Sequence, residues 1–230
     1  MKKSLPFIYL VLVFWSCSKE EIGPLDLYGE AYFPLHTGNF VIYNVDHTVY
    51  DLNGETQSIY QLKESVVDSF ASISGIHIYT IHRERWNDAE QQWKLIEAWS
   101  ARLENNEAVV AQGTIQYLKL KLPLSKDKSW DGNIYNIEEE EMYQADSLGL
   151  DYQVQGGEVI SNSITVIQKN NLDKIVETDY RIEKYAPNIG LIYKEITNLE
   201  YCTSNDDCLG QQIIEQGQIY KQTILSFGNE

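Results

Sequence analysis

The sequence predicts an all-β protein whose single antiparallel sheet has roughly ten strands. Segments rich in Val, Ile, Tyr, Phe and Thr recur along the chain, and turn residues separate them every 10 to 15 residues or so. Long stretches with helical periodicity are scarce. Proline stands outside the predicted strands, at Pro34, Pro123 and Pro187, because proline cannot donate to a strand ladder.

The first half of the domain contains clear turn signals between its predicted strands. Asn53-Gly54 favours a tight hairpin, since both residues tolerate the positive φ that such a turn requires. Asn87-Asp88 and Asn105-Asn106 indicate two further turns. The predicted strands cover 40–45, 59–70, 76–82, 93–103 and 107–111. The segment 93–103 also fits one helical face, so the sequence leaves strand and helix open there.

The second half continues in the same way. Residues 117–122 alternate leucine with lysine or tyrosine, which predicts a half-buried strand. Gly156-Gly157 marks a turn. The remaining predicted strands cover 159–168, 175–185, 191–199 and 213–225.

The N-terminus has the layout of a signal peptide. Lys2 and Lys3 precede an apolar run of about 11 residues, which is too short to span a bilayer as a helix, since that needs roughly 20. The residues before Cys17 fit an ordinary small-x-small cleavage site poorly, because Phe14 and Trp15 are bulky.

Residues 13–17 (Val-Phe-Trp-Ser-Cys) resemble the lipobox of bacterial lipoproteins, and the following 17–21 (Cys-Ser-Lys-Glu-Glu) look like mature starts in Bacteroidota. The resemblance implies that Cys17 carries lipid and anchors the protein to the outer membrane, on its periplasmic or cell-surface side. Thiolate nucleophilicity explains why a cysteine stands there. The alternative is a non-cleaved anchor with an ordinary buried cysteine.

A looser resemblance covers most of the remaining chain. Residues 32–39 (Tyr-Phe-Pro-Leu-His-Thr-Gly-Asn), 121–133 and 185–191 are similar to segments of uncharacterised lipoproteins of Bacteroidota type. The Ala-Pro-x-x-Gly-Leu stretch at 186–191 is also similar to secreted domains with a curved sheet. The resemblance therefore implies a curved sheet, an open barrel or a half-barrel, and it brings no catalytic residue.

Charge restricts the partners. The chain has 34 acidic and 18 basic residues, a formal net charge of −16, and removal of Lys2 and Lys3 with a signal peptide makes it more negative. Phosphate backbones and anionic lipid surfaces would repel such a protein. We therefore expect no nucleic-acid partner. We expect contact with the membrane through the lipid anchor, and the partner could be an envelope protein or a glycan.

No spacing typical of catalytic or metal chemistry is present, so we expect no catalytic residue, metal site or cofactor. His77 and His82 stand five apart in one predicted strand, which directs them to opposite faces. A glycosidase-like pair of carboxylates remains an alternative among so many acids. The tryptophans are expected in the aromatic core, with sugar stacking as the alternative.

Two further stretches carry alternatives. Glu138 to Glu141, with Asp146, lacks the fixed spacing of a calcium loop and is expected to be a solvated acidic stretch. Asp146-Ser147-Leu148 resembles the O-glycosylation motif of secreted Bacteroidota proteins, which would make Ser147 the acceptor. The alternative is that Ser147 is a turn residue.

Cys202 and Cys208 are expected to form a disulfide. They are the only cysteines that remain once Cys17 carries lipid, and a cysteine pair in an exported protein is usually bridged. The five residues between them favour a turn. A redox pair or a metal site is the alternative, but the spacing fits neither.

The sequence thus predicts a signal peptide at 1–16, a lipidated cysteine and tether at 17–30, and one all-β domain at 31–230. The leading hypothesis for function is a non-enzymatic binding or structural module of the cell envelope. The alternatives are a carbohydrate-active hydrolase with paired carboxylates and a carrier of an apolar ligand in a curved sheet. A polar cleft with two facing acids would favour the hydrolase, and an apolar cavity would favour the carrier.

Overall fold

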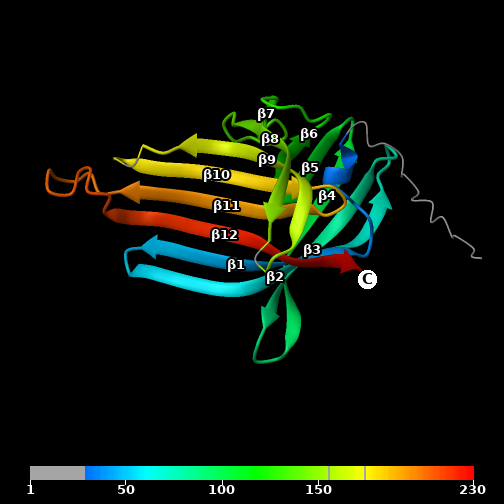
Figure 1. Ribbon diagram of the computed structural model, residues 1–230, viewed down its shortest axis with the longest axis horizontal. Helices are drawn as coiled ribbons and strands as arrows, with labels where there is room; N and C mark the ends of the chain where they lie inside the picture. Colours follow the sequence, from blue (N-terminus) through cyan, green and yellow to red (C-terminus); the bar gives the residue numbers. More distant parts are fainter. Residues whose placement is uncertain (1–28, 155, 174) are drawn as a thin grey trace, which may run out of the picture.

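Figure 1 shows a computed structural model of the chain, in which residues 29–154, 156–173 and 175–230 are described. These residues form one sheet of twelve antiparallel strands and one short 3-10 helix, η1 (Glu30–Tyr32). The strands are β1 (Asn39–Asp51), β2 (Gly54–Ala71), β3 (His77–Asn87), β4 (Gln92–Glu104), β5 (Glu107–Gln112), β6 (Ile115–Lys121), β7 (Ser129–Asp131), β8 (Met142–Gln153), β9 (Val159–Asn171), β10 (Glu177–Ala186), β11 (Gly190–Tyr201) and β12 (Ile214–Asn229).

Strands that follow one another in the chain are neighbours in the sheet, except β6 and β7. β12 pairs with β1 along almost the whole of both strands, from Asn39 opposite Asn229 to Tyr50 opposite Gly217. This pairing places the first and last strands in the middle of the sheet. The two edges of the sheet are therefore β6 and β7, which are consecutive in the chain.

The two edge strands approach each other, so that the curved sheet is nearly closed. The backbone N–H of Leu118 in β6 donates to the carbonyl of Gly132, just after β7, over 2.9 Å. The indole Nε1 of Trp130 in β7 donates to the Leu118 carbonyl over 3.0 Å. The Asn136 side chain donates to the carbonyl of Gln116. We call this contact between β6 and β7 the seam.

Two apolar clusters fill parts of the interior. The seam cluster joins β5 and β6 to β7–β10, and it contains Ala108, Val109, Leu118, Leu120, Leu122, Trp130, Tyr143, Ala145, Ile164, Val166 and Tyr185. The second cluster lies where the tip of the β8–β9 hairpin crosses the middle of the sheet (Figure 1), and it contains Tyr43, Val45, Leu62, Val154, Ile160, Ala186, Ile192 and Ile224. Each cluster takes residues from strands far apart in the sequence, which holds the sheet curved.

The predicted fold class is confirmed, with twelve strands where roughly ten were expected. The Asn53-Gly54 hairpin is present, and the ambiguous segment 93–103 is a strand, β4. Two strands were not predicted from the sequence: β7, which has three residues, and β8. In β8, Tyr143 and Ala145 alternate with exposed neighbours, but the acidic run before this strand obscured the pattern.

Among the described residues no helix is long and apolar enough to cross a membrane. The predicted signal peptide and Cys17 lie outside the described residues, as does the predicted tether apart from Gly29 and Glu30. These predictions therefore stay predictions.

Candidate functional site

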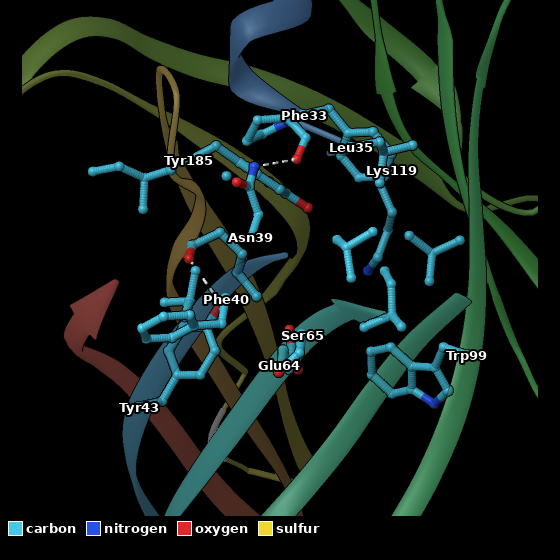
Figure 2. Close-up of a pocket in the computed structure, with 18 of the residues that line it drawn as sticks. Phe33, Leu35, Asn39, Phe40, Tyr43, Glu64, Ser65, Trp99, Lys119 and Tyr185 are labelled. Atoms are coloured by element: carbon cyan, nitrogen blue, oxygen red, sulfur yellow. Dashed lines mark hydrogen bonds between the residues drawn. The ribbon is translucent and has the colours of Figure 1, made fainter. Parts of the chain in front are cut away.

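A cavity of about 120 Å³ lies on the concave side of the sheet. Its walls come from β1–β6 and β10–β12, and the segment Phe33–Leu35 covers part of it (Figure 2). Most of the lining is apolar. Because nine strands contribute to one space, the cavity is a consequence of the curvature and does not belong to any single loop.

One wall of the cavity is a row of apolar side chains across three strands. Val66 in β2 stands opposite Ile81 in β3, and Ile81 stands opposite Trp99 in β4. All three line the cavity. Residues paired in this way lie side by side on the same face of a sheet, so the row forms a continuous apolar surface.

Another wall is a row of polar side chains across β10, β11 and β12. Glu183 stands opposite Lys194, and Lys194 stands opposite Gln222. These three also line the cavity. The glutamate side chain is only 2% exposed and that of Lys194 is 19% exposed. The curved sheet thus brings a charged row and an apolar row to one partly open cavity.

Glu183 is the centre of a buried ion cluster. Lys119 of β6 donates to its Oε1 over 2.7 Å, and Tyr185 donates to its Oε2 over 2.5 Å. Burial acts to raise the pKa of Glu183, but the charges of Lys119 and Lys194 outweigh it and hold the pKa at about 2. Glu183 is therefore ionised at neutral pH, and its neutralisation by lysines makes it unsuitable as a general acid.

The position of Lys119 corrects the prediction for residues 117–122. The alternating pattern predicted a half-buried strand, but Leu118, Lys119 and Leu120 are all buried. The leucines pack into the seam cluster, whereas the lysine lies on the cavity side. Both faces of β6 are interior because the sheet curls around the space in front of Lys119 (Figure 2).

Two buried polar atoms that line the cavity have no hydrogen-bond partner among the described residues: Gln222 Nε2 and Ser65 Oγ. The Gln222 carbonyl oxygen is occupied, since the hydroxyl of Tyr220 donates to it over 2.7 Å. The Tyr43 hydroxyl donates to the Leu191 carbonyl over 2.9 Å, and its oxygen lies beside the Gln222 amide in a weaker contact that does not meet the distance and angle of a full hydrogen bond. A buried donor without an acceptor is costly, at about 1–3 kcal/mol.

The cavity adjoins an open hollow of about 720 Å³. Trp99, Gln112 and Lys194 line both spaces, so they stand at the boundary between them. Arg83 lies in the hollow with its guanidinium 4.0 Å from the centre of the Trp99 ring. It also pairs with Glu64 over 2.9 Å. The hollow gives the cavity a polar approach from solvent.

The tryptophans occupy different environments. Trp130 is buried in the seam cluster, as predicted. Trp86 and Trp93 are half-buried and pack edge to face at the β3–β4 hairpin, with ring centres 5.3 Å apart. The prediction of a core position is wrong for these two and for Trp99, which is also half-buried and lines the cavity.

The acidic run is only partly the solvated stretch that was predicted. Glu138, Glu139 and Glu140 are exposed, but Glu141 is half-buried and pairs with Arg181 through both carboxylate oxygens. Among the described residues, no group of three or more His, Cys, Asp or Glu side chains is arranged to hold a metal ion.

Cys202 and Cys208 form the predicted disulfide, with Cα atoms 5.6 Å apart. It closes the loop between β11 and β12, far along the strands from the cavity residues. Ser147 is not in a turn: it lies half-buried in β8, opposite Thr165. Whether Ser147 is glycosylated stays a prediction.

The cavity residues were not predicted from the sequence. The pattern that could have indicated them is a charged or amide residue inside a β-rich segment, as at Lys119, Glu183 and Lys194. Such a residue is ordinarily on the solvent side of a half-exposed strand. Only the partners across the sheet identify these as interior.

No protein-family model and no curated protein matches the chain. Two solved structures are similar in outline. One is described as an exported protein with YmcC-like fold from Bacteroides fragilis NCTC 9343 (13% identity, TM-score 0.46, 86% of this chain and 99% of that one). The other is described as a lipoprotein from Parabacteroides distasonis ATCC 8503 (12% identity, TM-score 0.41, 86% and 98%). At these values the likeness carries no conclusion about function.

Proposed function

We propose that this protein is a non-enzymatic binding module of the cell envelope, anchored through lipid on Cys17, that takes the apolar part of a small molecule into the cavity. One observation carries the binding role: the curved sheet leaves a partly open cavity of about 120 Å³ with mostly apolar walls. A cavity of about 150 Å³ with apolar lining is enough to bind benzene. The adjoining hollow provides entry and room for the polar remainder.

The charges in the cavity support binding over hydrolysis. A glycosidase needs one carboxyl group that holds a proton at working pH. Glu183 has a pKa of about 2, and Glu64 is paired with Arg83. Both acids that line the cavity therefore serve as counter-charges. The volume also favours a small molecule over the long acyl chains that a lipid carrier would have to enclose.

Filling the cavity tests the binding role. In Val66→Phe the larger side chain takes up space beside Ile81, so the full chain in lipid nanodiscs should bind toluene or benzyl alcohol at least tenfold more weakly than the wild type. Val67→Phe is the control, because Val67 is the next residue of β2 and is exposed. Calorimetric titration against empty nanodiscs measures both. Equal binding by the two variants would contradict the role of the cavity.

A separate experiment tests the anchor. Cys17→Ser should abolish labelling by a fatty-acid probe and lipoprotein maturation in the native host. A variant that still labels would contradict lipidation at Cys17.

The absence of enzymatic function is tested by incubating the purified protein with glycoside, ester and peptide substrates. Turnover that one Asp or Glu substitution abolishes would overturn it.

A further inference from the structure

The polar wall of the cavity contains two hydrogen-bond donor groups, those of Lys194 and Gln222, whose hydrogen bonding is incomplete. Lys194 and Gln222 stand directly opposite each other on β11 and β12, so their Cβ atoms are about 5 Å apart. Both side chains present donors to the same cavity. Among the described residues Lys194 Nζ has no carboxylate at hydrogen-bond distance, and the Gln222 amide lies beside the Tyr43 hydroxyl without meeting the distance and angle of a full hydrogen bond.

Lys194 lacks a full counter-charge. Its Nζ lies 3.6 Å from Glu183 Oε1, which is an ion pair but too long for a hydrogen bond. That oxygen already accepts from Lys119 over 2.7 Å, and the other oxygen accepts from Tyr185. Burial, together with the charge of Lys119, lowers the pKa of Lys194 in spite of Glu183. One carboxylate thus serves two lysines.

Lys194 is the lining cation whose carboxylate partner lies beyond hydrogen-bond distance. Two lysines, Lys119 and Lys194, share Glu183, and Lys119 makes the hydrogen bond. The other lining acid, Glu64, is paired with Arg83. A single negative charge beside Lys194 would give it a hydrogen-bonded counter-ion.

We propose that the ligand is a small organic carboxylate, held by Lys194 Nζ and Gln222 Nε2 through its two oxygens, with an apolar body beside Val66, Ile81 and Trp99. This rests on the proposed function and names the chemistry of its ligand. Two donors side by side match the two oxygens of a planar carboxylate. A phosphate dianion would bring more negative charge than Lys194 alone can neutralise. Ser65, which also lines the cavity and stands opposite Phe40, is not used by this site.

The body of the ligand is limited by the cavity. A volume of about 120 Å³ accommodates roughly one aromatic ring or a short aliphatic chain. Benzoate fits this description, and benzyl alcohol and benzylammonium keep the same ring while they replace the anion by a neutral and a cationic group. The three compounds form a matched set of probes.

The experiment titrates the full chain, held in lipid nanodiscs, with each probe by calorimetry, with empty nanodiscs as the reference. Hydrogen bonds to an ionised group are stronger than neutral ones, so benzoate should bind at least tenfold more tightly than benzyl alcohol, and benzylammonium most weakly. Lys194→Met should remove the preference for benzoate. Lys194→Arg should keep part of it.

A second variant guards against a folding defect in the first. Gln222→Glu keeps the size of the side chain and supplies a carboxylate beside Lys194 from the protein itself. It should lose benzoate binding, retain benzyl alcohol binding and melt at or above the temperature of the wild type.

Equal affinity of the wild type for benzoate and benzyl alcohol would overturn the carboxylate and leave the proposed binding function standing. A preference for benzoate that survives in both Lys194→Met and Gln222→Glu would show that the anion binds elsewhere, which also overturns it. Failure of all three probes to bind would contradict the proposed function itself.

Discussion

Trp130 and Trp99 lie on the interior side of the same curved sheet, yet their surroundings differ. Trp130 is 3% exposed, its ring packs edge to face against Tyr143, and its indole N–H is hydrogen-bonded to the chain. Trp99 is half-buried, contacts Arg83 with its ring, and borders an unfilled space. The difference shows that one interior is divided into a packed seam that maintains the fold and a cavity that is open to a ligand.

The largest expected effect separates the two tryptophans. Trp130→Ala should lower the free energy of unfolding by about 3–5 kcal/mol, because it leaves a hole in a closed cluster and frees the Leu118 carbonyl. Trp99→Ala should cost about 1 kcal/mol, chiefly the contact with Arg83. Urea denaturation of both variants measures the difference. Similar losses would mean that Trp99 belongs to the core.

The same division applies to charge. Glu183→Gln should lower the free energy of unfolding by about 3 kcal/mol, because Lys119 and Lys194 lose a buried counter-charge. Glu97→Gln is the matched control, since its ion pair with Arg83 is half-exposed and worth about 0–1 kcal/mol. If Glu183→Gln were as harmless as the control, the ion cluster would contribute nothing to the fold.

Acid should weaken the cavity side of the molecule before the seam. The pKa of Glu183 is about 2 in the folded protein against an ordinary value of 4.5, so its contribution is complete above pH 4.5 and is lost as the pH falls towards 2. The contribution amounts to at most about 3 kcal/mol. The gap in stability between wild type and Glu183→Gln should therefore shrink between pH 5 and pH 2.5, as chemical denaturation can measure. A gap that stays constant over this range would contradict the assignment.

The disulfide lies outside both regions. Replacing Cys202 and Cys208 with serine should cost about 2 kcal/mol, since a bridge across so short a loop removes little entropy from the unfolded chain. Ligand binding and the difference between the two tryptophan variants should be unchanged. The urea midpoints of the oxidised protein and the double variant test this. A change in probe affinity would instead couple the loop to the cavity.

Much of the fold could be predicted from local patterns. Asn53-Gly54 and Asn105-Asn106 determine their turns through backbone preference alone, and residues 159–168 or 191–199 read as strands because β-branched and aromatic residues recur there. The pairing of β1 with β12 could not be predicted, since their partners are almost the length of the chain apart. β8 was not predicted because the acidic run just before it obscured the alternating Tyr143 and Ala145.

The sequence by itself determined that the protein is a sheet of antiparallel strands with a bridged pair of cysteines, because hairpin turns, period-two alternation and cysteine pairing act over short distances. It also determined that Lys119 lies on the face of its strand opposite Leu118 and Leu120. Which residues contact that face of β6 depends on the tertiary structure. The sheet curls until β6 contacts β7, so Lys119 points towards Glu183 from the far side of the barrel, 64 residues away in the chain. Alternation determines the two sides of a strand, but curvature determines which of them are inside, and curvature depends on packing between residues that are remote in sequence.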